Sequence, residues 1–454
     1  MKKSCIATVW LLLGLTGGSS AEDLLSVYHQ ALQADPRLRI AELRVDIGKA
    51  QVRQSVGRLF PQISGTANIT WNRQDQEQVR TDSFKGERYN IVLTQPILDI
   101  AKYKDWQRAS AISGQHEQEF IDTRHQLMLD TVDRYFSVLA AEDDLFFTQD
   151  ESETTKQRLR QVKKLYSKQL VKVTDLLEVE ARLDKIDVDV IEAENNLEIT
   201  QESIAELTGT NIVEISTLNN TVEFNKLPDI ADRWIKEARN NNPGLKAKQE
   251  AINAAREDLS QQLAGHYPVV NFQASALNSD IGFDNARTNH TQTHVAGLNL
   301  TLPIFDGGST SARVYEARKR LELVMHEYES HYRTILKDTK ASFLSTNTSV
   351  KRIQASKKAV ESASKSYEAM DRGYKHGVVT IIDVLDAQHE KFRAKRDLQK
   401  AKYEYITNHI QLLRVTGLIN DRALQEVNNW LGSPAEIDIA LRGRAKLNFL
   451  EEID

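Results

Sequence analysis

The sequence predicts a mainly α-helical protein that also contains β-strands and is built from one helix–strand–strand–helix unit that occurs twice. Six of the eight prolines form three pairs, each 207 residues apart: Pro36 and Pro243, Pro61 and Pro268, and Pro96 and Pro303. Three later pairs are 208 residues apart: Tyr166 and Tyr374, Asp175 and Asp383, and Gly209 and Gly417. Landmarks that keep the same offset, apart from one residue inserted between Asp306 and Tyr374, indicate a duplication. Segments of alternating polarity and very long runs without proline complete the prediction.

The first 21 residues are predicted to be a signal peptide. Lys2 and Lys3 precede an apolar run at residues 5–15, and residues 19–21 are the small side chains that signal peptidase needs. The apolar run is too short to span a bilayer, which argues against a membrane anchor. The only cysteine, Cys5, lies inside this segment, so disulfides are expected to play no part in the exported chain.

Composition and motifs exclude several classes of function. The formal net charge of −5 becomes −7 once Lys2 and Lys3 are removed, and this balance argues against a nucleic-acid surface. No later stretch approaches about 18 apolar residues, so no helix is expected to cross a membrane. The motifs of a phosphate-binding loop and of a zinc protease are absent, and His326 and His331 are five residues apart, which does not align two ligands on a helix. We therefore predict no catalytic residue, no metal site and no cofactor.

The first unit is expected at residues 22–209. A short helix leads to a second helix that begins near Pro36, since proline is favoured in a first helical turn. Strands follow at about 62–72 and 88–98, and a helical hairpin at 100–208 completes the unit.

The second unit is expected at residues 231–417, with strands at about 269–278 and 292–304 and a hairpin at 308–416. The two remaining segments are predicted to be an equatorial linker between the units and a C-terminal equatorial segment or tail: residues 210–230 and 418–454. The last part of the tail, residues 432–454, carries no signal that we interpret.

The strand segments alternate in polarity. In the first, one face carries the less polar side chains: Ile63, Gly65, Ala67, Ile69 and Trp71. Such segments are typical of a transmembrane barrel, and they fit equally well a soluble sheet with one wet face. The polar connections at residues 72–88 and 278–291 are expected to be outer loops. Because four strands cannot close a barrel and open edges are not tolerated in lipid, membrane strands would require an oligomer.

The helices of the hairpins are unusually long. Residues 101–168 contain no proline and a single glycine, Gly114, and residues 309–376 again contain no proline. At 1.5 Å per residue, a run of some 65 residues reaches on the order of 100 Å. The returning runs at 174–207 and 380–415 are about half as long, so the helix before each strand pair is expected to stack end to end with the returning helix. Their crowded charges are typical of a solvated coiled coil.

Each hairpin turns at a short tip that holds two acids at the start of a helix. Asp175 and Glu178 are three residues apart, as are Asp383 and Asp386, so each pair lies on one helical face. The simpler interpretation is capping, because Asp175 with Glu178, and Thr380 with Asp383, both have the spacing of a capping box. Asp386 is then left without a capping role.

The tip at residues 373–387, Gly-Tyr-x-x-Gly-x-x-Thr-Ile-Ile-Asp-Val-Leu-Asp-Ala, together with the signal peptide and the duplicated unit, resembles the TolC family of outer-membrane efflux and secretion channels. The resemblance extends over residues 22 to about 431. It implies a fold that is mainly α with transmembrane β. In this fold a homotrimer in outer-membrane lipid forms a 12-stranded β-barrel, and a 12-helix α-barrel continues it through the periplasm.

The resemblance also implies roles at the tips. Asp383 and Asp386 match carboxylates that line the periplasmic constriction of the family, where crowding should raise their pKa and favour cations. Four residues match the latch that holds the closed state: Thr174, Asp175, Tyr374 and Val379. Val379 departs from the arginine of the best-known members, and three nearby cations could replace it: Lys172, Arg372 and Lys375.

Four residues match the tips on which adaptor proteins of the family dock: Gln169, Leu170, Gly377 and Val378. Gln169 departs from the family pattern, because the equivalent residue is often glycine. The implied function is a passive conduit of a tripartite efflux or type I secretion system. A periplasmic adaptor and an inner-membrane transporter of the ABC or RND type would open it to export small molecules or proteins. The alternatives are a periplasmic adaptor and an exported coiled-coil structural protein.

Overall fold

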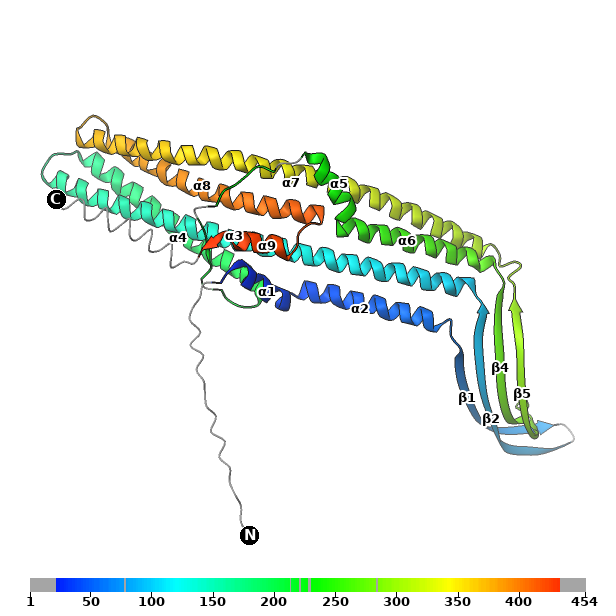
Figure 1. The fold of residues 1–454 in the computed structure, drawn as a ribbon. Coiled ribbons are helices and arrows are strands. Elements are labelled where there is room, and N and C mark those ends of the chain that lie inside the picture. Colours follow the sequence, from blue (N-terminus) through cyan, green and yellow to red (C-terminus); the bar gives the residue numbers. More distant parts are fainter. Residues whose placement is uncertain are drawn as a thin grey trace, which may run out of the picture.

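The computed structural model describes residues 22–76, 79–212, 214–219, 222–227, 230–282 and 285–432. The protein is a long bundle of helices with a β-sheet bent away at one end and two helical tips at the other (Figure 1). The predicted signal peptide at residues 1–21 and the tail from residue 433 lie outside the described residues. Within the described ranges, no helix has the length and apolar character needed to cross a membrane.

The first repeat consists of six elements: α1 (Leu24–Ala34), α2 (Pro36–Gly57), β1 (Gln62–Gln76), β2 (Val79–Leu98), α3 (Ile100–Ser167) and α4 (Val173–Thr208). The second has the same order, with one 3₁₀ turn added: α5 (Ala231–Asn241), α6 (Pro243–Leu263), η1 (Ala264–His266), β4 (Val269–Ile281), β5 (Arg287–Thr301), α7 (Ser309–Lys375) and α8 (Ile381–Thr416). Three short elements complete the chain: β3 (Thr217–Leu218), α9 (Asp421–Asn428) and β6 (Leu431–Gly432).

One proline pair, Pro36 and Pro243, marks equivalent helix starts, those of α2 and α6. In the second repeat, Asn242 caps α6 by accepting a hydrogen bond from the Leu245 amide at 2.9 Å. The Asn242 side chain also donates to the carbonyl of Val415 at 2.8 Å, so the start of α6 meets the end of α8. Gly417 has a φ of +73°, and a Cβ there would lie 2.5 Å from the carbonyl oxygen of Asn241, so this junction needs glycine. Helices α8 and α6 therefore succeed each other along α7 (Figure 1).

The two strand pairs join into one antiparallel sheet in the order β1-β2-β4-β5. The repeats meet at β2 and β4, where Ile91 lies opposite Ala276. Strands β1 and β5 are the edges. Side chains along β5 are exposed throughout, and Trp71 on β1 is 80% exposed. A single chain therefore leaves both edges of the sheet and much of its apolar surface uncovered.

The strands are longer than expected. The prediction of long outer loops at residues 72–88 and 278–291 is therefore wrong. Gln74 of β1 still lies opposite Asp82 of β2, and Ile281 of β4 lies opposite Arg287 of β5. Polar side chains are compatible with these strands because the ladder hydrogen bonds come from the backbone. Polarity alone could not separate a loop from a strand that extends beyond its apolar stretch. At its other end β5 stops at Thr301, before the predicted residue 304.

The largest hydrophobic core lies midway along the bundle, where α1, α3, α8 and α9 contribute buried side chains such as Tyr28 and Tyr135. The Tyr135 hydroxyl donates to the carbonyl of Ser216 at 2.7 Å, which holds the segment after α4 against α3. Thr217 of β3 pairs with Gly432 of β6. The segment between the repeats and the segment after α8 therefore come together beside this core.

Candidate gate at the hairpin tips

The first tip is a tight turn between α3 and α4. Gln169 has a backbone φ of +61°. Residues other than glycine adopt this left-handed conformation only at a cost in free energy. Leu170 beside it is 67% exposed. Helix α4 begins at Val173 after Lys172, whose side chain makes no capping hydrogen bond.

The prediction that Asp175 begins a capping box is therefore wrong. The turn ends early enough for α4 to start before Thr174, which leaves Asp175 in the first helical turn. An acid there still interacts favourably with the helix dipole. The Thr174 hydroxyl lies 3.5 Å from Oδ1 of Asp175, and Thr174 itself is exposed.

The second tip repeats this turn with different chemistry. Gly377 has a φ of +71°, and Val378 beside it is 78% exposed. The predicted capping box of Thr380 and Asp383 is confirmed: the Thr380 amide donates to Oδ2 of Asp383 at 2.8 Å, and the Asp383 amide donates to the Thr380 hydroxyl at 3.3 Å. The hydrogen bond that the Thr380 hydroxyl donates to the carboxylate, and then the one from the Thr380 amide, lower the pKa of Asp383. Within one chain this direction is opposite to the rise expected from crowding in a ring.

A small hydrophobic core holds the two tips together. Val162 of α3, Val179 of α4, and Ile381 and Leu385 of α8 are all buried in it. Tyr374 packs against this core, and its buried hydroxyl has no hydrogen-bond partner among the described residues. Burial, and then the charge of Asp175, raise the pKa of Tyr374.

Val379 lies against the last turns of α7. A Cβ on Gly373 would come within 3.2 Å of a Val379 methyl carbon, so the valine fills the space beside this glycine. Two of the cations considered as substitutes for an arginine at 379 are engaged on α7 itself. Arg372 pairs with Glu368 at 3.4 Å, and Lys375 pairs with Asp371 at 3.1 Å.

Near the tips, two ion pairs that the sequence did not indicate join the hairpins. Arg158 of α3 donates to Asp371 of α7, and Arg182 of α4 donates to Asp386 of α8. Asp386, which the capping box leaves without a role, is therefore paired with Arg182. Because the residues of each pair are more than 200 positions apart in the chain, no local spacing could have signalled them.

A cavity of about 820 Å³ opens between the tips. Val162, Leu165 and Ile381 contribute apolar surface to it. Several basic side chains also line it: Arg158, Lys164, Lys168, Lys172 and Lys375. Of the residues predicted to latch the gate or receive an adaptor, the structure brings five to this cavity: Leu170, Asp175, Tyr374, Gly377 and Val379.

Further from the tips, α3 and α8 meet through buried polar groups. The Glu151 carboxylate is 4% exposed and lies 3.0 Å from Nδ1 of His389 and 3.3 Å from a guanidinium nitrogen of Arg396. One turn along α3, the Thr155 hydroxyl accepts a hydrogen bond from the Gln388 amide at 2.8 Å. The contact between the hairpins is therefore partly ionic and directional, unlike the apolar core at the tips.

The family model of the outer membrane efflux proteins matches two parts of this chain, residues 27–210 and 234–418. The chain belongs to this family. Each matched part corresponds to one repeat of the structure, and the resemblance predicted from the tip motif is confirmed.

Several proteins are similar to this chain over most of their length. Outer membrane protein TolC of Salmonella enteritidis is 30% identical, with 96% of this chain and 90% of the relative covered. TolC of Escherichia coli (strain K12) has the same identity and coverage. The alkaline protease secretion protein AprF of Pseudomonas aeruginosa is 24% identical, with 92% and 89% covered.

Solved structures of outer-membrane channels share the fold. The CmeC channel of Campylobacter jejuni superposes with a TM-score of 0.79 at 16% identity, covering 95% of this chain and 98% of CmeC. VceC of Vibrio cholerae gives a TM-score of 0.77 at 16% identity, covering 87% and 96%. The family and the fold are those of channel proteins. This member is an outer-membrane channel for efflux or secretion that extends into the periplasm.

Proposed function

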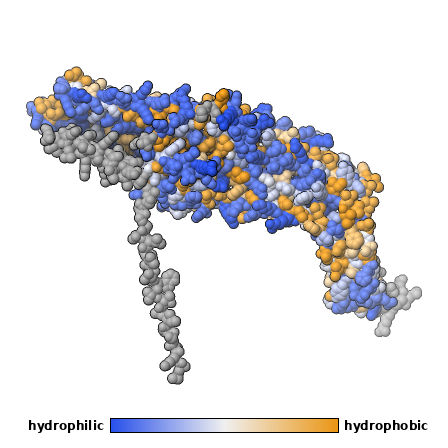
Figure 2. Space-filling view, in the orientation of Figure 1, coloured by the Kyte–Doolittle hydropathy of each residue, from blue (hydrophilic) through white to orange (hydrophobic). Residues whose placement is uncertain are grey.

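We propose that three copies of this chain assemble into one closed conduit across the outer membrane and the periplasm. The open sheet carries the argument. Each chain contributes one four-stranded sheet with two free edges, and free edges are not tolerated in lipid. Ile63, Trp71 and Leu298 are 70%, 80% and 72% exposed, and apolar surface gathers over the strands next to the helical body (Figure 2). Lipid and neighbouring strands would cover these groups.

Exposed apolar stripes on the helices support the same assembly. On α2, Ile40, Leu43 and Ile47 are 51%, 44% and 55% exposed at helical spacing. On α4, Val188 and Ile191 are 54% and 65% exposed. Stripes of this kind are expected to pack against a neighbouring helix, and in a closed ring the neighbour would belong to the next subunit.

The assembly is tested by native mass spectrometry of the detergent-extracted protein, followed by conductance in a planar bilayer. A trimer with stable unitary conductance is expected. A protein that is soluble without detergent and monomeric would overturn the proposal and would favour the exported coiled-coil alternative.

We further propose that the tips form the periplasmic gate, with Asp383 and Asp386 near the constriction and Thr174, Asp175, Tyr374 and Val379 at contacts between neighbouring hairpins. The unsatisfied hydroxyl of Tyr374 supports a contact that only assembly completes. The combined variant Asp383→Asn and Asp386→Asn should reduce selectivity for cations in single-channel recordings. Unchanged selectivity would argue against a carboxylate ring.

The exposed tips are proposed to dock a periplasmic adaptor, which would connect the conduit to an inner-membrane ABC or RND-type transporter. Leu170 and Val378 are apolar and 67% and 78% exposed, as expected of contacts that a partner buries. A related protein of Pseudomonas putida is named a toluene efflux pump outer membrane protein, which supports a pump as partner. Leu170→Ser and Val378→Ser should weaken co-purification of the adaptor, whereas Leu177→Ser, on an exposed residue of α4 after the tip, should not.

A further inference from the structure

The ion pair between Arg182 and Asp386 changes the charge of the proposed gate. Arg182 lies one helical turn after Val179, and Asp386 follows Leu385, so packing of the small tip core brings the two charged groups together. The Arg182 side chain is only 21% exposed, which restricts the positions its guanidinium can take, whereas Asp386 is 62% exposed.

The neighbouring acid has no such partner. Asp383 accepts its hydrogen bonds from Thr380 of the same turn, and no basic side chain of the described residues forms an ion pair with it. Hydrogen bonds from neutral groups leave a carboxylate charge in place, whereas a guanidinium cancels it. The two acids therefore differ in the charge that they present.

We propose that Arg182 is a selectivity-determining residue of the channel: it neutralises Asp386, so that Asp383 supplies the net negative charge of this part of the gate. The inference rests on the proposed position of the tips at the constriction. The Arg182, Asp383 and Asp386 side chains then sum to one negative charge per subunit. Without Arg182 the two acids would give two.

The same pair links α4 of the first hairpin to α8 of the second, so separation of the hairpins breaks it. Because Asp386 is largely exposed, an ion pair of this kind adds little to the stability of the fold. Its main effect is therefore on ion selectivity, and only secondarily on how readily the tips part.

The test is a cycle of variants in planar bilayers with a KCl gradient, read as reversal potential. Arg182→Gln should move the reversal potential toward the potassium value, because it exposes a second carboxylate charge. Asp386→Asn should move it the other way, because the arginine left alone offsets Asp383. The double variant restores one net negative charge and should return selectivity to that of the wild type.

The matched control is Arg160→Gln, which removes the same charge from an exposed arginine that pairs with Glu153 on α3, and it should leave the reversal potential unchanged. If Arg182→Gln behaves as wild type and the double variant behaves as Asp386→Asn, the inference is wrong although the channel stands. Absence of any conductance from the wild type would instead refute the proposed function. The open probability tests the second role, in which the ion pair links α4 to α8. The double variant restores the charge but not this link, so a change in its open probability reports the link alone.

Discussion

Arg158 of α3 and Asp371 of α7 form an ion pair that ties the first hairpin to the second close to the tips. The Arg158 side chain is 9% exposed and that of Asp371 is 19% exposed. Burial acts to raise the pKa of Asp371, but hydrogen bonds from Arg158 and Lys375 outweigh it, so this pKa lies below its usual value. Unlike the exposed pair at Asp386, this one is placed to contribute to stability.

Arg158→Gln should loosen the contact between the hairpins. Breaking a buried ion pair by removing one partner costs about 3–5 kcal/mol, and because Lys375 still faces Asp371 we expect about 2 kcal/mol. Faster amide exchange at the ends of α3 and α7, and a higher open probability in bilayers, would report the loss. Arg372→Gln, which breaks only an exposed pair on α7, is the control and should change stability by less than about 0.5 kcal/mol. Equal effects of the two variants would contradict the prediction.

Glu151 gives a second test of the contact between α3 and α8. Glu151→Gln keeps the size of the side chain but removes the charge that faces Arg396 and His389. Because these partners are partly exposed, we expect a loss of about 2 kcal/mol rather than the ~3–5 kcal/mol of a fully buried pair. The measurement is the thermal unfolding midpoint in detergent. Glu153→Gln, whose carboxylate is 56% exposed, should leave the midpoint nearly unchanged.

Local signals explain how much of this fold the sequence could predict. Proline at a helix start, glycine at a helix end and the Thr380 capping box depend on residues within one turn of each other, and each was found where the structure has it. The capping prediction failed at Asp175 because the backbone turn at Gln169, not the acid, decides where α4 begins.

Contacts between the repeats could not be predicted from the sequence. Arg158 and Arg182 are two of many basic residues on long charged helices, and only the packing of α3 and α4 against α7 and α8 selects their partners. The strand ends were missed for a related reason, because backbone pairing beyond Gln74 leaves no apolar pattern in the side chains. The tips could therefore be located from the sequence, but the pairing of their charges could not.

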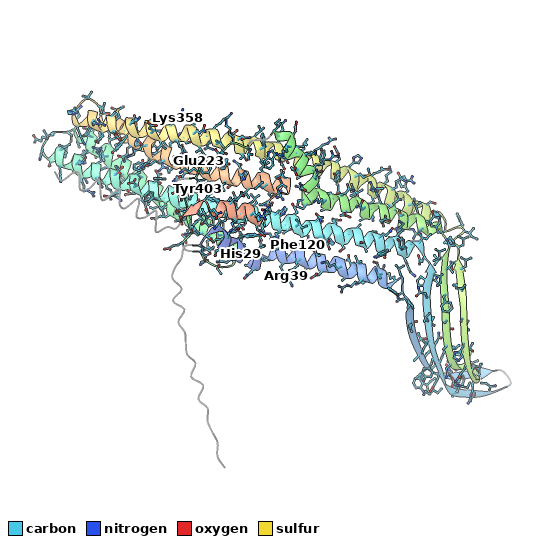
Figure 3. All side chains as sticks on the ribbon, in the orientation of Figure 1. His29, Arg39, Phe120, Glu223, Lys358 and Tyr403 are labelled. Atoms are coloured by element: carbon cyan, nitrogen blue, oxygen red, sulfur yellow. The ribbon has the colours of Figure 1, made fainter. Side chains whose placement is uncertain are left out.

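Stability should also depend on pH through Glu142 of α3. Burial, and then the nearby charges of Asp143 and Glu214, raise the pKa of Glu142 from 4.5 to about 7. Tyr403, whose hydroxyl donates to Asp143 at 2.6 Å, lies in the same part of the bundle (Figure 3). A raised pKa means that the folded state binds the proton more tightly. The stabilisation of the folded state by this proton is therefore complete below about pH 4.5 and is lost as the pH rises through 7.

We expect the free energy of unfolding to fall by at most about 3 kcal/mol between pH 5 and 8 from this group. Glu142→Gln should match the wild type near pH 5 and exceed it at pH 8, because the amide does not ionise. Thermal midpoints across this range provide the measurement. Glu198→Gln, on an exposed residue of α4, is the control, and its thermal midpoint should change with pH in parallel with that of the wild type. A Glu142→Gln curve that is also parallel would contradict the assigned pKa.

The two tips share one backbone turn but only one of them has glycine. Gln169 and Gly377 have φ values of +61° and +71°, and the left-handed region costs a residue with a Cβ about 1 kcal/mol relative to glycine. Gln169→Gly should therefore stabilise the first tip by roughly 0.5–1 kcal/mol, and Gly377→Gln should destabilise the second by about 1 kcal/mol. Hydrogen exchange at the start of α4 and α8 measures both effects.

Gln157→Gly is the matched control, because it makes the same substitution at an exposed position inside α3. There glycine should destabilise the helix by about 1 kcal/mol, the opposite sign to that expected at Gln169. Destabilisation by Gln169→Gly would mean that the glutamine side chain makes a contact at the tip that outweighs its backbone strain. Since Gln169 is exposed in one chain, that contact would have to come from a second subunit or from the adaptor.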